Sequence, residues 1–290
     1  MTIIESILLG LIQGLTGVFP VSSSGHLVIV RKLLGLSGDN IMLFNVLLHT
    51  GTLAAVFTSF RKDILRLYRE ILLFFDQLIY NGKTAYRNIR YREGARYKRA
   101  AKSNYRKLLF LLLVSTLPTL LIAYICKESA ALSMDSPLAA GIGFYVSCVL
   151  LIVVDFTGEG KKMPRDTGWK QAVLIGVMQG CAVYAGVSRI AITICIGLLL
   201  GYSRKFAIKY SFLLSLPAVI LALVWECKEA FGNHLAVGEF LVMIPGVLIA
   251  ALVGIFMIPY ALNLMKKFPL RSFAIYSFII GSCALIINFV

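Results

Sequence analysis

The segment FPVSSSGH at residues 19–26 places three hydroxyls, a glycine and an imidazole side by side within an otherwise apolar stretch. A second polar segment, YAGVSR at 184–189, ends in Arg189, the only charged residue between Lys170 and Arg204. An isolated charge in so apolar a stretch is costly and by default marks a functional site, although an arginine that caps the carbonyls of a broken helix is the structural alternative. Chemistry is therefore expected at these two segments.

Together these residues favour chemistry on a phosphate group. A guanidinium offers two parallel donors to one phosphate, and a helix beginning after each segment would direct free backbone N–H groups at the same anion. A serine would act as nucleophile or oxyanion donor, with His26 as the base that activates it and then protonates the leaving group. The sequence has no P-loop, kinase or dinucleotide-binding glycine pattern, so a lipid-linked phosphate fits better than a soluble nucleotide. His49 stays open between a structural and a functional role, and His234 is expected in a surface loop.

The elements that position these segments are expected to lie in a lipid bilayer. The 290 residues are 59% apolar, with a mean hydropathy of +0.83, which is too apolar for an ordinary soluble domain. The expected fold class is an all-α polytopic membrane protein, with residues 1–290 forming a single membrane domain. About six stretches are long enough to span the bilayer: 41–59, 108–126, 137–155, 207–226, 238–259 and 271–289.

Four shorter apolar stretches flank the two polar segments. The regions 3–36 and 170–201 are therefore expected to form re-entrant helix hairpins, whose irregular backbone is tolerated at membrane depth only beside protein or a water-filled cavity. An offset of 166 aligns the two regions and the spans that follow them, with eleven identities between residues 10 and 48. This self-similarity predicts two copies of one unit, at about 1–59 and 170–226.

Basic residues predict the orientation of the two copies. The net charge is +15, and 24 of the 29 Lys and Arg fall in 61–107, 161–170, 204–209 and 266–271. The positive-inside rule places these regions in the cytoplasm. The first hairpin then enters from the outer face and the second from the cytoplasmic face, which is an inverted-topology repeat with its site near the midplane. Arg31 and Lys32 lie against this rule, and lipid head-group contact is all that the pattern suggests for them.

The basic loop 61–107 is expected to have two parts. Apolar side chains recur at helical spacing over 64–79, which predicts a helix lying in the membrane interface. Residues 81–107 combine basic residues with tyrosines, a composition that suits anionic lipid and also RNA. Contact with membrane lipid is the favoured interpretation, and no nucleic-acid partner is expected.

Three segments resemble the integral-membrane undecaprenyl-diphosphate phosphatases of the bacitracin-resistance family. They are LLGLIQGLTGVFPVSSSGHLVI at 8–29, LFNVLLHTGTLAAV at 43–56, and AGVSRIAITICIGLLLGYSRKFAIKYSFLLSLPA at 185–218. The resemblance covers nearly the whole chain. It implies an enzyme of the bacterial plasma membrane that removes the terminal phosphate of undecaprenyl diphosphate near the outer face, recycling the lipid carrier for cell-wall synthesis.

The resemblance carries a set of site residues onto this sequence, where the matching positions are Gln13, Ser23, His26 and Arg189. We predict catalytic roles for His26, Ser23 and Arg189. We predict that the diphosphate is bound by Gln13, Ser22, Ser24, Gly25, Gln179, Gly186, Ser188 and Thr193.

The sequence departs from the family pattern at the chemistry itself. Gly17 stands where the family has a glutamate, and the block at 185–191 lacks the family's proline, second serine and last glycine. No metal ligand is identifiable, so a divalent cation such as Mg²⁺ or Ca²⁺ would have to be bridged by the substrate diphosphate. A glutamate restored at Gly17 is expected to raise metal-dependent activity.

Two other functions stay open. The same inverted repeat suits a non-hydrolytic transporter or binding protein for polyprenyl phosphates. A transporter of small solutes or ions is less favoured, because the membrane segments lack the acidic residues that couple transport to protons or Na⁺.

Overall fold

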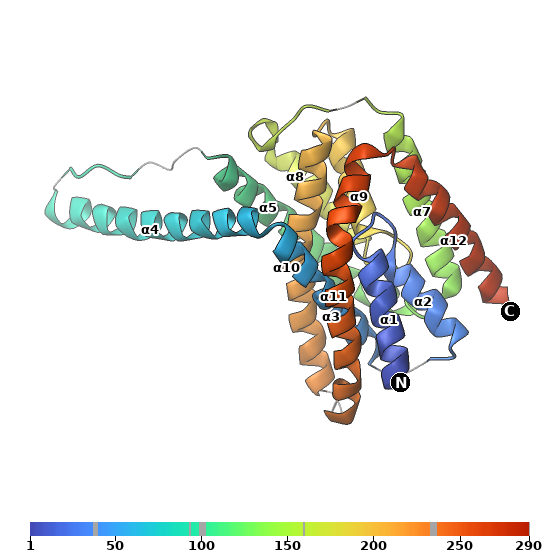
Figure 1. Ribbon diagram of the computed structural model, residues 1–290. Helices are drawn as coiled ribbons and strands as arrows, with labels where there is room; N and C mark the ends of the chain where they lie inside the picture. Colours follow the sequence, from blue (N-terminus) through green and yellow to red (C-terminus); the bar gives the residue numbers. More distant parts are fainter. Residues whose placement is uncertain (37–39, 93, 99–102, 159, 233–236, 290) are drawn as a thin grey trace.

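The computed structural model describes residues 1–36, 40–92, 94–98, 103–158, 160–232 and 237–289, and this part of the chain is almost entirely α-helical (Figure 1). His234 lies outside the described residues. In chain order the helices are α1 (Ile3–Thr16), α2 (Ser23–Leu33), α3 (Ile41–Ser59), α4 (Arg61–Tyr91), α5 (Asn104–Ile125), α6 (Lys127–Ser133), α7 (Pro137–Asp155), the 3-10 turn η1 (Pro164–Asp166), α8 (Trp169–Cys181), α9 (Arg189–Leu199), α10 (Arg204–Gly232), α11 (Val237–Lys267) and α12 (Arg271–Phe289).

Six of these helices are long and apolar enough to cross a membrane: α3, α5, α7, α10, α11 and α12. Each coincides, to within one residue at the end of α5, with one of the stretches expected from the sequence or extends beyond it. The predicted fold class, an all-α polytopic membrane protein, is therefore confirmed. The sequence did not predict the short helix α6, which follows α5 directly and leads into α7.

Two helix pairs, α1–α2 and α8–α9, occupy the regions expected to form hairpins. The offset of 166 relates the helices as well as the sequences, because α9 begins 166 residues after α2 and both have 11 residues. The preceding helices pack in the same way. A Cβ built on Gly10 of α1 would lie 2.1 Å from the Gly246 carbonyl of α11, and one on Gly176 of α8 would lie 2.1 Å from the Ser115 carbonyl of α5. The matched glycines thus let each helix pack closely against a long neighbour.

The third helices of the two copies, α3 and α10, run antiparallel to each other. Asp63, just beyond the end of α3, pairs with Lys209 near the start of α10 at 2.9 Å. Phe60 and Phe212 stack nearby, with ring centroids 5.6 Å apart. Towards the opposite ends, Cys227 of α10 packs against the cluster that contains Leu43 of α3. Equivalent helices that point in opposite directions are the signature of an inverted repeat.

The half-helices α2 and α9 start beside the middle of α7 and run to its opposite ends. The first turn of α2 meets Phe144, and its last turn, at Arg31, reaches the Met134 carbonyl just before α7 begins. The residue before α9 donates its backbone N–H to Ser147 Oγ, and the loop after α9 joins Lys162, beyond the end of α7. Both N-termini therefore converge on the centre of the bundle.

Arg31 is not the lipid-facing residue that the sequence suggested. Its side chain is buried, donates to the Met134 carbonyl, and lies 3.9 Å from a carboxylate oxygen of Asp135. Arg31 therefore holds the end of α2 against the turn before α7, so the expectation of head-group contact was wrong for Arg31; for Lys32, which is exposed, it stays a prediction.

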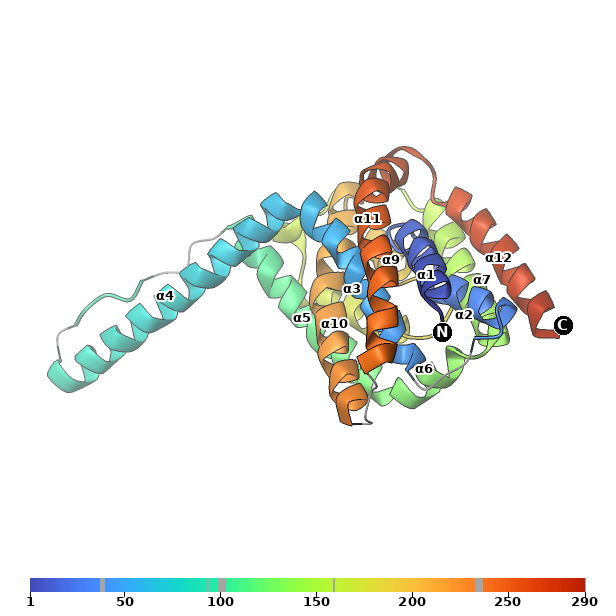
Figure 2. The same cartoon turned by 60° about the horizontal axis from the view of Figure 1, so that its bottom comes forward.

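The helix α4 projects away from the rest of the bundle, as both views show (Figures 1 and 2). It is one continuous helix of 31 residues, longer than the 64–79 segment expected from apolar spacing. Beyond Gln77 the apolar periodicity weakens, but hydrogen bonds from the returning chain support the helix: the Asn81 and Asn88 side chains bond backbone groups of Lys98 and Ala95. Placement in the membrane interface stays a prediction.

Candidate active site

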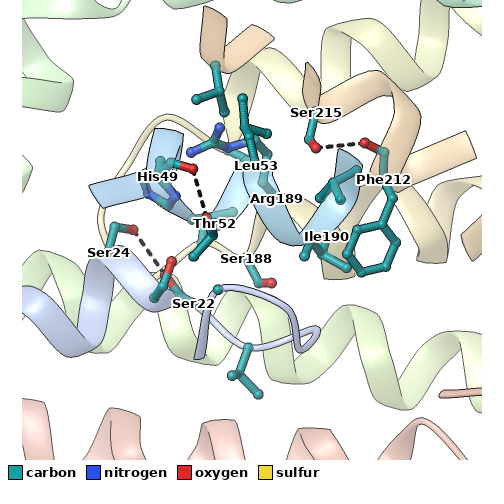
Figure 3. Close-up of a pocket in the computed structure, with 17 residues that line it drawn as sticks. Ser22, Ser24, His49, Thr52, Leu53, Ser188, Arg189, Ile190, Phe212 and Ser215 are labelled. Atoms are coloured by element: carbon teal, nitrogen blue, oxygen red, sulfur yellow. Dashed lines mark hydrogen bonds between the residues drawn. The ribbon is translucent and has the colours of Figure 1, made fainter. Parts of the chain in front are cut away.

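A pocket lies where the two polar segments meet α3 and α10 (Figure 3). It encloses about 50 Å³, so a small polar group fits within it whereas an isoprenoid chain must lie outside. Twelve of its lining residues form six pairs related by the offset of 166: Val21 with Val187, Ser22 with Ser188, Ser23 with Arg189, Ser24 with Ile190, His49 with Ser215, and Leu53 with Val219. Both copies therefore contribute to one pocket at the centre of the repeat.

The serines of the pocket differ in their hydrogen-bond partners. Ser22 is the N-cap of α2 and accepts from the Gly25 N–H at 3.2 Å, and Ser188 caps α9 in the same way. Ser24 shares a hydrogen bond of 3.1 Å with Ser22. Among the described residues no hydrogen bond involves the Ser23 hydroxyl, although Ser23 is largely buried. Ser23 is therefore the hydroxyl that is free to react with a ligand.

Arg189 brings a cation into the same pocket. Its side chain reaches in beside Leu53 and His49 (Figure 3), and no hydrogen bond or ion pair to another described residue holds its guanidinium. An arginine in an apolar site normally satisfies its donors with a carboxylate or with carbonyls. The structural alternative, in which Arg189 caps a broken helix, is thus not what the described contacts show, and all five donors stay available for an anion.

The whole pocket favours negative charge. The first turns of α2 and α9 direct backbone N–H groups and the positive ends of their dipoles towards it. The described lining contains Arg189 and His49 but no Asp or Glu. A ligand with several oxygens, such as a phosphate, satisfies these donors.

Comparison with known proteins identifies the family. Residues 6–283 match the family described as bacitracin resistance protein BacA. The chain belongs to the BacA family. Its similar proteins include the undecaprenyl-diphosphatases of Alkaliphilus metalliredigens, 36% identical over 288 residues, and of Methanosphaera stadtmanae, 33% identical over 288 residues, each alignment covering 99% of both chains. The undecaprenyl-diphosphatase of Desulfatibacillum aliphaticivorans is 34% identical over 289 residues, again with 99% of both chains covered.

In this BacA family member the imidazole of His26 does not line the pocket. Its Nδ1 donates to the Ser22 carbonyl at 2.5 Å, and its Nε2 accepts from the Tyr276 hydroxyl at 2.8 Å. The ring packs against Phe144 of α7 on the far side of the serine turn. Both nitrogens are occupied, so this arrangement fits a residue that positions the serines better than a base that touches the substrate.

The two glycines predicted to bind the diphosphate serve close packing. A Cβ on Gly25 would lie 2.8 Å from the Gly186 Cα, so these residues bring the two polar segments into contact. Gly186 has φ of +81° and its Cβ would lie 1.9 Å from the Ala140 carbonyl, which only glycine tolerates.

Thr193, Gln179 and Gln13 also lie outside the pocket lining. Thr193 donates to the Arg189 carbonyl and meets Ser211 at 2.5 Å, within the helix packing. Gln179 is buried, with no partner for its Nε2 among the described residues. Gln13 is fully buried behind the pocket, and its Nε2 lies 2.9 Å from His49 Nδ1. Thr193 and Gln13 each contact a residue that lines the pocket, Thr193 through the Arg189 carbonyl and Gln13 through the His49 ring.

His49 is the pocket residue that the sequence left undecided. It comes from the middle of α3, far in sequence from either polar segment, and no local motif marks it. Its repeat equivalent is Ser215, also at the pocket. Extending the offset of 166 from the hairpins to α3 and α10 pairs His49 with Ser215, and this pairing is the sequence signal that could have identified His49 as a pocket residue.

The pocket does not offer a conventional divalent-cation site. The described residues contain no group of three or more His, Cys, Asp or Glu that could hold a metal. The polar side chains of the described lining are hydroxyls, one imidazole and one guanidinium, whereas Mg²⁺ and Ca²⁺ take carboxylate oxygens. The side chains present therefore do not fit a protein-held cation.

Proposed function

We propose that the chain hydrolyses undecaprenyl diphosphate to undecaprenyl phosphate and phosphate, recycling the lipid carrier for cell-wall synthesis. The observation that carries this proposal is that the Ser23 hydroxyl and the Arg189 guanidinium, neither of which has a hydrogen-bond partner among the described residues, line one pocket. The names of the relatives agree with it, since the chain aligns with proteins named undecaprenyl-diphosphatase over almost its whole length and theirs.

In the proposed reaction, Arg189 binds non-bridging oxygens of the terminal phosphate and balances the charge that spreads over them in the transition state. Ser23 Oγ attacks the terminal phosphorus, forming a phosphoserine as the bond to the bridging oxygen breaks. The hydroxyl proton leaves with undecaprenyl phosphate. Water then cleaves the Ser23 O–P bond and releases phosphate. The N-terminal amides of α2 and α9 hold the phosphate oxygens during both steps.

A divalent cation has no necessary part in these steps. We propose that any Mg²⁺ or Ca²⁺ arrives bound to the diphosphate of the substrate, because the described lining provides no carboxylate to hold it. Activity is then expected to persist, at reduced rate, when free divalent cations are removed.

We also propose how the chain sits in the membrane. The protein lies in the bacterial plasma membrane with its basic loops in the cytoplasm, and the pocket takes its substrate from the outer leaflet. The helix α4 has a continuous row of exposed apolar side chains, including Leu72, Phe75 and Ile79. This row suits contact with the acyl chains, while the basic residues of 61–107 contact anionic lipid head groups.

The runner-up function is a non-hydrolytic protein that binds or transports polyprenyl phosphates. It is favoured by one observation, the lack of a carboxylate in the described lining. The test is phosphate release by the purified protein given undecaprenyl diphosphate, with Mg²⁺, with Ca²⁺ and with chelator, and with Ser23→Ala as the control. Turnover that disappears in the control supports the hydrolase. Lipid binding without turnover in any of these conditions supports the alternative.

A further inference from the structure

His49 has one ring nitrogen held from behind and the other open to the pocket. Its Nδ1 lies 2.9 Å from Gln13 Nε2, and Gln13 belongs to the fully buried interior. No hydrogen bond from a described residue reaches His49 Nε2, and His49 lines the pocket beside Arg189 (Figure 3). The open nitrogen is thus the one that a ligand meets.

The neighbouring threonine identifies which atom of the Gln13 amide faces His49. Thr52 Oγ1 donates its proton to the His49 backbone carbonyl at 2.8 Å, so only its lone pairs remain for Gln13. Gln13 Nε2 lies 3.5 Å from that oxygen, at the outer limit of a hydrogen bond, so the NH₂ group is the end of the amide that fits there, while Gln13 Oε1 has no partner among the described residues. The same NH₂ group then donates to His49 Nδ1.

The tautomer of His49 follows from this chain of hydrogen bonds. A nitrogen that accepts a hydrogen bond carries no proton, so the proton of the neutral ring lies on Nε2. His49 therefore presents a donor to the pocket, and cannot accept the proton of Ser23 at that nitrogen. This donor adds to those of Arg189 and the two helix N-termini.

We propose that His49 is a substrate-binding residue that donates its Nε2–H to a non-bridging oxygen of the diphosphate, and that Gln13 is the positioning residue that fixes this tautomer. The inference rests on the proposed function for its substrate class. Under this proposal the neutral His49 ring supplies part of the phosphate binding that a bridging cation would otherwise supply. Arg189 is the only charged residue among the described lining of the pocket.

Binding of a non-hydrolysable analogue, the polyprenyl methylenediphosphonate, tests the proposal without requiring turnover. His49→Phe keeps an aromatic ring but removes the donor, and its Kd is expected to rise about ten- to a hundredfold. His49→Gln restores a donor and is expected to stay within about threefold of the native Kd. Thr50→Val is the matched control, because Thr50 lies on α3 next to His49 but donates to the Val46 carbonyl. It is expected to bind like the native protein.

Gln13→Glu gives a second readout that does not depend on His49→Phe folding. A carboxylate accepts a hydrogen bond from Nδ1–H, so the proton of the neutral ring then lies on Nδ1 and Nε2 presents a lone pair to the phosphate. Only the doubly protonated ring still donates from Nε2. The ratio of the variant Kd to the native Kd is expected to rise with pH. A flat ratio, or equal binding by native protein and folded His49→Phe, overturns the proposal. If the native protein binds the analogue but releases no phosphate from undecaprenyl diphosphate, the proposed hydrolysis is refuted, whereas the binding role of His49 is not.

Discussion

Replacing Arg189 with methionine separates ligand binding from folding. Methionine has a similar length but no charge or donors. Because no described residue bonds the guanidinium in the free protein, the substitution breaks no intramolecular hydrogen bond. It also removes a partly buried charge that has no partner among the described residues, which is unfavourable in a protein interior. The thermal stability of Arg189→Met is therefore expected to equal or exceed that of the native protein.

The effect on catalysis is expected to be large and in the opposite direction. Removing one partner of a desolvated charge pair costs about 2–5 kcal/mol, which corresponds to a fall in kcat/KM of about 30- to 5000-fold. Arg189→Lys keeps the charge but loses the fork that binds two oxygens at once, so it is expected to lose about ten- to a hundredfold.

The assay measures phosphate release from undecaprenyl diphosphate beside thermal unfolding in the same detergent. Arg31→Met is the matched control, since Arg31 is a buried arginine whose described contacts are to Met134 and Asp135 rather than to the pocket. It is expected to lower the melting temperature while the folded protein keeps its turnover. The reasoning is refuted if Arg189→Met unfolds earlier than native protein, or retains kcat/KM within about tenfold of it.

Three further substitutions test the rest of the site. Ser23→Ala is expected to abolish phosphate release, whereas Ser24→Ala keeps measurable turnover; equal losses in steady-state assays would contradict the assignment of the nucleophile. His26→Ala is expected to lower both the melting temperature and the rate, about ten- to a hundredfold, because it releases the Ser22 carbonyl; a greater than thousandfold loss at unchanged stability would instead favour a direct proton-transfer role. Gly17→Glu is expected to make turnover rise with added Mg²⁺ or Ca²⁺, at a cost in stability, because its Cβ would lie 2.7 Å from the Gln13 carbonyl. Metal titration and unfolding check this, and an absence of any metal response would show that the pocket has adapted to glycine.

Much of the fold could be predicted from the sequence because the bilayer imposes a simple rule on apolar length. The six helices that are long and apolar enough to span a membrane follow from it, and the breaks at Ser22 and Ser188 were visible as polar residues in apolar stretches. The meeting of Ser23 and Arg189 was also foreseeable, since they hold equivalent positions in the two copies.

The remaining features depend on three-dimensional packing that no local pattern encodes. The direction of the His26 ring is set by Ser22 and Tyr276, the second of which lies 250 residues away. The burial of Arg31 depends on the turn before α7, and a charge-counting rule has no information about that turn. His49 sits mid-helix, where an apolar context gives the same signal for a core residue and for a binding residue.

The pairing of Ser23 with Arg189 has a consequence for how such a protein can arise. An ancestral dimer of two identical chains in opposite orientations would place the same side chain at both positions, giving two serines or two arginines. Two serines lack a cation for the phosphate, and two arginines lack a nucleophile and repel each other. Only when the two copies are encoded separately, whether fused in one chain or as two different chains, can each position change independently. Divergence of the copies was therefore a precondition for the proposed division of attack and charge neutralisation between the two halves of the pocket.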